Sequence, residues 1–377
     1  MKKTLIVAAV SASFAVAAHA QSSVTLYGVL DSGISYQSNV ANANGEGKSL
    51  WTAGSAGIDQ SRWGLRGSED LGGGLKAVFN LESGFNIGNG KLNNNGGMFN
   101  RQAFVGLSSG QYGTVTLGRQ YDSVQDYLAP LTAAGSWGGT FFAHTGNLDN
   151  LSTNNGYAVN NSVKFQSANY AGFTFGGTYG FSNSTQFANN REYSVGANYQ
   201  YQGLKVGAAY SQQNNPAIAV GSTGATGGSP FGTLAGEAFR SRVYGAGLGY
   251  TFGPAEVGFA WTQARADNIV GGGLIRQDNY EVNGKYNVTA AMSLGLAYTF
   301  TNQKDTAGAS DAKTRFHQIG AQADYSLSKR TDVYAQVAYQ HAMGDSAFAS
   351  IYNGDPTTNA STSPNQTAAT IGLRHRF

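Results

Sequence analysis

Apolar and polar residues alternate with a period of two along most of this chain, in stretches of about ten residues. In residues 23–36 the side chains of Val24, Leu26 and Ile34 fall on one face, and Asp31 falls on the other. Successive side chains of a strand point to opposite faces, so the pattern predicts strands with one apolar and one polar face. Roughly sixteen segments show it: 23–36, 61–70, 75–85, 102–109, 114–119, 161–170, 173–181, 192–201, 204–213, 241–252, 255–264, 278–287, 292–300, 317–327, 332–340 and 367–377.

The connections between these segments fall into a short class and a long class. Short turns occupy 69–74, 108–113, 170–172, 201–203, 252–254 and 326–332. Long polar connections occupy 37–59, 86–97, 212–236, 265–276, 301–313 and 344–364. Short turns at one end and long loops at the other are typical of outer-membrane barrels. Such a sheet must close into a barrel, because backbone N–H and C=O groups left unpaired at a free edge cost too much free energy in lipid. We therefore predict an all-β fold, a 16-stranded antiparallel transmembrane β-barrel with a water-filled lumen.

One connection, residues 121–157, differs from the others in its content of large apolar side chains. These are Tyr127, Leu128, Leu131, Trp137, Phe141 and Phe142. A solvated surface loop rarely carries so many such groups. We expect this third extracellular loop to fold inward against the barrel wall, where it would narrow the lumen.

Composition and the first residues agree with an exported membrane protein. Charged residues make up only 12% of the chain, against roughly 25% in a typical soluble domain. Lys2 and Lys3, a short apolar run and the sequence Ala18-His19-Ala20 predict a cleaved signal peptide at 1–20, leaving one barrel domain at 21–377. Cysteine is absent, so no disulfide is expected.

Motifs that would carry catalysis or cofactor binding are not supported. GEGKS at 45–49 has Asn42 where a phosphate-binding loop needs glycine, and GAGLG at 245–249 lies inside an alternating strand. The histidines have no metal-ligand spacing, and no Ser-His-Asp constellation stands out. Lysine and arginine are scattered singly, which argues against nucleic acid. We predict no enzyme activity, no cofactor and no metal.

Charged residues on the inward face are the candidate pore-constriction residues. They are Arg62, Arg66, Lys76, Arg101 and Lys164 on the strands, and Asp122 and Asp126 on the long connection, where Asp149 follows. In one interpretation any polar-lined channel carries such charges without defined roles. In the other, which we favour for Arg62 and Arg101 and leave open for the rest, a basic wall faces an acidic loop and sets the ion preference of the channel.

The chain resembles general porins of the betaproteobacterial type over its whole length after residue 20. The resemblance is carried by SSVTLYGVLDSGISY (22–36), SRWGLRGSEDLGGGLKAVFNLESGF (61–85), RQAFVGLSSGQYGTVTLGRQYD (101–122), NNSVKFQS (160–167) and GLRHRF (372–377). It implies passive transport of ions and small hydrophilic solutes across the Gram-negative outer membrane, with Arg62 and Arg101 lining the constriction. A substrate-specific outer-membrane channel with a solute-binding eyelet is the alternative.

The resemblance also implies partners. They are two further copies in a homotrimer, outer-membrane lipid and lipopolysaccharide, the outer-membrane assembly machinery, and small hydrophilic solutes and ions. Phe377 resembles the terminal assembly signal of this family. Some relatives carry another arginine just before the NNS motif, where this chain has Ala158 and Val159, so the basic arc is expected to be thinner here.

Overall fold

The computed structural model describes residues 22–377 except for 56, 94–95, 153, 155, 216–223, 227–230, 232–238, 270–272, 308–309, 346, 353 and 355–359. The predicted signal peptide at 1–20 lies outside these residues. In the part of the chain so described, no helix is long and apolar enough to cross a membrane.

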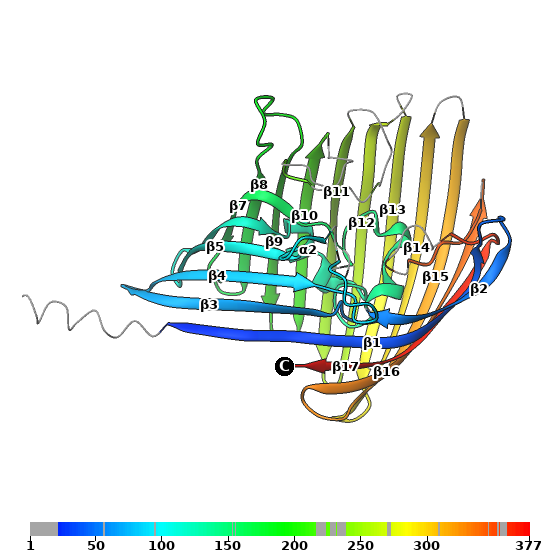
Figure 1. Ribbon diagram of the computed structural model, residues 1–377, viewed down its shortest axis with the longest axis horizontal. Helices are drawn as coiled ribbons and strands as arrows, with labels where there is room; N and C mark the ends of the chain where they lie inside the picture. The colour runs from blue at the N-terminus through cyan, green and yellow to red at the C-terminus, as the bar shows by residue number, and fades with distance from the viewer. Residues whose placement is uncertain are drawn as a thin grey trace, which may run out of the picture.

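The described residues form seventeen strands in a single antiparallel sheet. The strands are β1 (Ser23–Ala41), β2 (Gly47–Ser55), β3 (Arg62–Gly72), β4 (Leu75–Gly84), β5 (Gln102–Ser109), β6 (Gly113–Gln120), β7 (Val159–Ser167), β8 (Phe173–Gly180), β9 (Arg191–Tyr201), β10 (Leu204–Asn214), β11 (Arg240–Phe252), β12 (Ala255–Ile269), β13 (Gly273–Asn287), β14 (Met292–Ala307), β15 (Ser310–Ser326), β16 (Thr331–Gly344) and β17 (Asn365–Arg376). Figure 1 shows the sheet curling round so that β1 and β17 lie side by side.

The sheet closes through β1, which pairs with β17 along one edge. Along its other edge, the first half of β1 pairs with β3 and the second half pairs with β2. β2 and β3 therefore fill one place in the wall, and the barrel has sixteen strand positions. The predicted closed 16-stranded antiparallel barrel is confirmed.

The outward and inward faces have the polarity expected from the alternation. Outward Val24, Leu26 and Leu107 expose half or more of their surface, whereas Asp31, between the outward positions of β1, is fully buried. On the lumen side, glutamine, asparagine and threonine replace the apolar core of a soluble protein. This arrangement suits a barrel with lipid outside and water inside.

Three of the predicted long connections are wrong, because the strands continue into them. β12 and β13 leave only 270–272 between them, and β14 and β15 leave only 308–309. The segment 37–59 holds the end of β1 and all of β2. Beyond the apolar band both faces of a strand are polar, so the hydrogen-bonded ladder continues while the alternation of hydrophobicity disappears.

The long connection between β6 and β7, here called L3 (residues 121–157), folds against the lumen face of the barrel. It contains α2 (Ser123–Tyr127) and the 3-10 turns η3 (Ala129–Leu131), η4 (Thr140–Phe142) and η5 (Thr145–Asn147). α2 contacts β8, β9 and β10, η3 contacts β11 and β12, and η4 contacts β16. Figure 1 shows α2 within the curve of the sheet.

Glycines on the lumen face make room for the apolar side chains of L3. The Trp137 ring covers Gly295 of β14, where an added Cβ would overlap it. The Phe142 ring covers Gly320 of β15, where its Cε1 would be 2.7 Å from an added Cβ. These close approaches let an irregular segment bury its apolar groups on a wall that is otherwise polar.

Glutamine and asparagine side chains of the wall satisfy the carbonyl groups of L3. Gln322 donates to Trp137 O at 3.0 Å, Gln318 to Phe141 O at 3.0 Å, and Asn283 to Leu131 O at 3.0 Å. Buried backbone carbonyls need such partners when no regular helix or strand supplies them. The polar lumen therefore serves as a hydrogen-bonding template for the loop.

Candidate functional site

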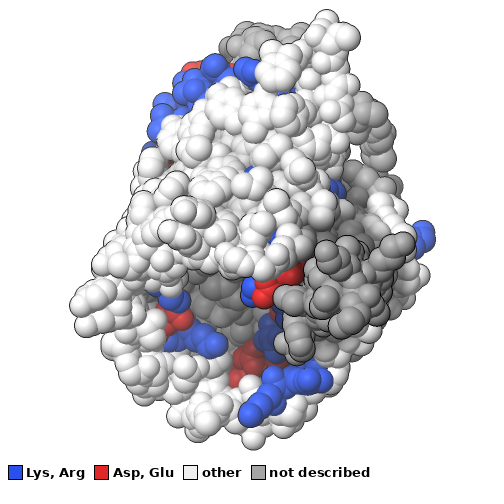
Figure 2. All heavy atoms as spheres, turned by 90° about the vertical axis from the view of Figure 1, so that its left-hand side faces the viewer, with Lys and Arg blue, Asp and Glu red and all other residues white. Residues whose placement is uncertain are grey.

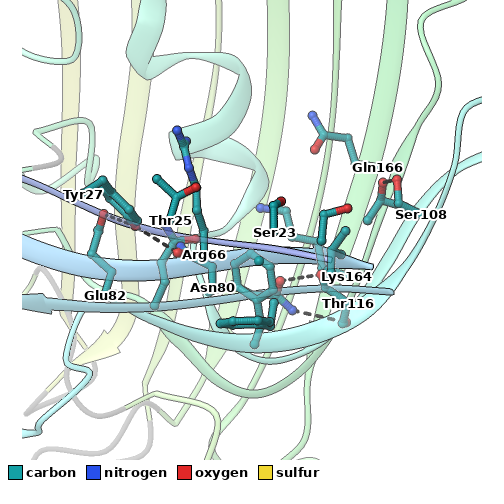
Figure 3. Close-up of a pocket in the computed structure, with 18 of the residues that line it drawn as sticks. Ser23, Thr25, Tyr27, Arg66, Asn80, Glu82, Ser108, Thr116, Lys164 and Gln166 are labelled. Atoms are coloured by element: carbon teal, nitrogen blue, oxygen red, sulfur yellow. Dashed lines mark hydrogen bonds between the residues drawn. The ribbon is translucent and has the colours of Figure 1, made fainter. Parts of the chain in front are cut away.

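The wall from β1 through β3 to β7 and the helix α2 of L3 enclose a cavity of about 700 Å³ in the lumen. Figure 3 shows Tyr27, Arg66 and Glu82 close together at one part of it, with Lys164 and Gln166 at another. Most lining residues carry hydroxyl or amide groups: Ser23, Thr25, Ser68, Asn80, Gln102, Ser108, Thr114, Thr116, Gln120 and Gln166. Such a lining hydrates small polar solutes without selecting one shape.

Two of the predicted arginines meet at Glu82 of β4. Arg101 Nε lies 2.7 Å from Glu82 Oε1, and Arg62 Nε lies 3.7 Å from Glu82 Oε2. Arg101 is only 4% exposed, and its guanidinium stands over the Tyr121 ring at 5.7 Å. Arg62 keeps 24% of its side chain exposed. Of these two arginines, Arg62 therefore offers the larger charged surface to the lumen.

Acidic residues continue this cluster along the same wall. Asp59, which precedes β3, lies 3.2 Å from Arg62 Nη1 and 2.8 Å from Arg374 Nη1 of β17. Arg374 Nε in turn lies 3.0 Å from Asp332 of β16. Bases and acids thus alternate along the wall, so its positive field is weaker than the number of arginines suggests.

The remaining predicted residues lie in three different settings. Lys164 of β7 forms an ion pair with Asp126 of α2 and donates to Tyr121 O at 3.1 Å, which joins the wall to L3. Arg66 lines the cavity with its guanidinium 5.2 Å from the centre of the Tyr27 ring. Lys76 is exposed near the turn between β3 and β4. Glu82 is six positions further along β4, which is about 20 Å along a strand.

Asp122 caps α2, which packs on β8, β9 and β10, and its carboxylate bonds Ser211 of β10. Its carboxylate caps α2 by accepting from Gln125 N at 3.0 Å, and the residue is 4% exposed. Burial raises the pKa of Asp122 to about 6, although the Gln125 N–H acts in the opposite direction. Asp122 is not among the residues that line the cavity, and of the predicted basic residues only Lys164 acts on the pKa of its carboxyl group.

The middle of L3 is tied to the barrel by a buried cluster of three ionisable groups. His144 Nδ1 lies 2.5 Å from Asp149 Oδ2, and His144 Nε2 lies 3.0 Å from Glu281 Oε2 of β13. Burial disfavours the imidazolium, but the carboxylates of Asp149 and Glu281 outweigh it and raise the pKa of His144 to about 10. Thr262 Oγ1 also donates to Asp149 at 2.6 Å. A charged histidine between two carboxylates thus holds the loop in place.

Sequence reasoning missed several members of these clusters. Asp59 fell in a segment expected to be a surface loop, and His144 was weighed only as a metal ligand. Glu281 had a usable signal, because it follows Gln277 and Asn279 on the inward face of β13. Its partner could not be identified, since nothing in the sequence says which part of L3 reaches β13.

The space-filling view agrees with this distribution of charge. Figure 2 shows a hollow in which basic and acidic atoms lie together, while most of the surrounding surface in that view is neither basic nor acidic. A closed barrel with an apolar exterior, a charged lumen and an internal loop defines a transmembrane channel.

The comparisons with known proteins agree with this class. The family model described as Gram-negative porin matches residues 6–345, and the chain belongs to that family. It is 33% identical to an outer membrane porin protein of Bordetella pertussis and 31% identical to outer membrane porin protein 32 of Delftia acidovorans, with all of each chain covered.

A solved structure agrees as well. The anion-selective porin from Comamonas acidovorans matches with a TM-score of 0.75 and 28% identity, over 95% of this chain and 100% of that one. This protein is an outer-membrane porin, a channel and not an enzyme, through which ions and small hydrophilic solutes diffuse passively.

Proposed function

We propose that the gap between α2 of L3 and the wall β1, β3–β7 is the filter of this porin, with a weak preference for anions. Arg62, Arg66 and Lys164 would supply the positive field. The positive charge of Arg101 would offset the negative charge of Glu82. Lys76 and Asp122 would contribute little, because Lys76 lies at the turn end of β4 and Asp122 is buried where it caps α2.

The observation that carries this proposal is the state of Arg66. Among the described residues no carboxylate lies within ion-pair distance of Arg66, although Arg62, Arg101 and Lys164 each face one. Arg66 lines the cavity, so its charge acts on passing ions. The similarity to a porin described as anion-selective supports the same direction.

Reversal potentials in a salt gradient test the proposal. The wild-type channel should show a small preference for chloride over potassium, and Arg66→Gln should remove most of it. Arg62→Glu should shift the reversal potential further, in the direction of a preference for potassium. Arg330→Gln, in the turn between β15 and β16, is the matched control and should leave the potential unchanged. Equal reversal potentials for wild type and both lumen variants would refute the filter.

We also propose that the short wall is buried in a homotrimer. β5, β6 and β8 have eight residues each, fewer than the 9–11 that a tilted strand needs to span the membrane. On the opposite side β14 and β15 have 16 and 17 residues. Outward Val105 and Leu117 on the short wall are 58% and 54% exposed in the single chain. Cross-linking in detergent should give trimers, and a monodisperse monomer would refute the assembly.

The other partners follow from the location in the outer membrane. We propose that lipid and lipopolysaccharide surround the tall wall, and that the assembly machinery reads the strand ending in Phe377. Reduced folding in membranes of a variant lacking Phe377 would support the second point.

A further inference from the structure

The outer face of β9–β13 carries arginines where a lipid-facing wall would be expected to be apolar. On β11 the outward positions run from Leu248, which is 48% exposed, through Tyr244 to Arg242 and Arg240 in steps of two. Inward Ser241, between these arginines, is 2% exposed, and inward Val243, between Arg242 and Tyr244, is 6% exposed. The arginines therefore project from the outside of the barrel and not into the channel.

Neighbouring strands repeat this arrangement in register. Arg242 pairs with Arg265 of β12, and Arg265 pairs with Arg276 of β13. Arg191 begins β9 on the same face. The whole set, here called the outer arginine band, consists of Arg191, Arg240, Arg242, Arg265 and Arg276 with Asp267 and Asp278 among them.

The outer arginine band lies directly beyond a row of aromatic rings. The ring centres of Tyr210 and Tyr244 are 6.2 Å apart, and those of Tyr244 and Trp261 are 5.9 Å apart. Trp261 pairs in register with Tyr280 of β13. Aromatic girdles mark the level of the lipid headgroups in membrane barrels. The arginines thus begin where the acyl chains end.

The height of the wall supports this placement. From Arg242 to Phe252, at the short-turn end of β11, the strand advances by ten residues. That is about 34 Å of strand, or about 26 Å of height at a tilt of about 40°, which matches an apolar band of about 25 Å. The long connection 215–239 leads into β11 at the arginine end, so this end faces the extracellular side.

The aspartates in the band hold the guanidinium groups in position without cancelling their total positive charge. Asp267 accepts from Arg240 at 3.3 Å and from Arg265 Nε at 2.5 Å, and it also pairs with Arg242. Five arginines against two aspartates leave a net positive charge. Arg240 and Arg276 keep 50% and 47% of their side chains exposed. Arg242 Nε has no hydrogen-bond partner among the described residues.

We propose that the outer arginine band binds the phosphate groups of the outer-leaflet glycolipid, lipopolysaccharide, an inference that rests on the proposed position of this lipid around the tall wall. Guanidinium groups recognise phosphate through paired N–H donors, and several held side by side match the closely spaced phosphates of such a headgroup. Basic groups at the membrane surface attract anionic lipid in the same way. The glycolipid would thereby seal the tall wall at its junction with the outer leaflet.

Binding to the full-length folded barrel in detergent, after removal of bound lipid, tests this proposal. The probes are diphosphorylated lipid A, the same lipid after enzymatic dephosphorylation, and phosphatidylglycerol, with bound lipid counted by native mass spectrometry. The wild type should bind the diphosphorylated form at least tenfold more tightly than either other lipid. The triple variant Arg240→Gln, Arg242→Gln, Arg276→Gln should lose this preference.

A conservative variant and a matched control keep the result interpretable. Arg276→Gln alone should fold normally, because Asp278 still accepts from Gln263, and it should weaken binding severalfold. The double variant Lys329→Gln, Arg330→Gln removes two exposed cations at the short-turn end and should bind like the wild type. Equal affinity of wild type and triple variant, or equal binding of phosphatidylglycerol by the wild type, would overturn the proposal.

Discussion

His144 of L3 places its Nε2 3.0 Å from Oε2 of Glu281, a side chain of β13 that lies 137 residues away in the sequence. The other ring nitrogen faces Asp149, and the three side chains are almost completely buried. The His144 side chain thus links the middle of L3 to the barrel wall.

Replacing His144 with alanine should loosen L3. The change leaves Asp149 and Glu281 as buried carboxylates without a cation, and breaking a buried pair in this way costs about 3–5 kcal/mol. We expect a lower thermal unfolding temperature and larger fluctuations of the single-channel current. His341→Ala is the control, because that histidine lies on the outward face of β16 and bonds Asn365. Identical current noise in the two variants would contradict the role of His144.

The same cluster predicts a dependence on alkaline pH. The pKa of His144 is raised from 6.5 to about 10, so the native state holds this proton more tightly than the unfolded state. Its contribution to stability is complete below about pH 6.5 and is lost as the pH rises through about 10. Thermal unfolding between pH 6 and pH 11 should therefore show a decline that His144→Gln lacks. If the unfolding temperatures of the wild type and His144→Gln change with pH in parallel, His144 is not the cause of the decline.

Adding a methyl group at Gly295 should narrow the channel. An added Cβ overlaps the Trp137 ring, and overpacking of this kind forces neighbours to shift at a cost of about 1–3 kcal/mol. The wall is fixed by its ladder, so L3 should move toward the lumen and the single-channel conductance should fall. Gly249→Ala is the control, because the atom nearest to its added Cβ is 3.6 Å away. Equal conductance of both variants would argue against displacement.

The seam of the barrel gives a prediction about Phe377. Its N–H donates to Gly28 O and its C=O accepts from Gly28 N, both at 3.1 Å, and its ring lies over Gly28. Deleting Phe377 should reduce the yield of folded protein in outer membranes, while the conductance of the folded fraction stays unchanged. Phe377→Ala keeps the backbone pair and should separate the effect of the ring from that of the ladder. A normal yield for the deletion would refute this role.

Alternation with a period of two was enough to predict the fold, because lipid outside and water inside act on every strand in the same way. The alternation predicted the closed barrel and the inward faces of Arg62 and Arg66. The large apolar side chains of L3 predicted that this loop folds inward. The alternation failed for the ends of β12–β15, where both faces of the strands are polar and the hydrophobic contrast disappears.

The partners of the charged groups were decided only by the tertiary structure. Strand parity tells which face a residue takes, but the stagger between distant strands and the path of L3 determine what it meets. Arg101 is therefore buried against Glu82 instead of open to the lumen, and His144 meets Glu281. The sequence by itself determined a barrel with a polar lumen and a folded-in loop. Only the closed structure decided which charges neutralise one another, because ion pairing depends on distances of a few ångströms between segments that are far apart in the chain.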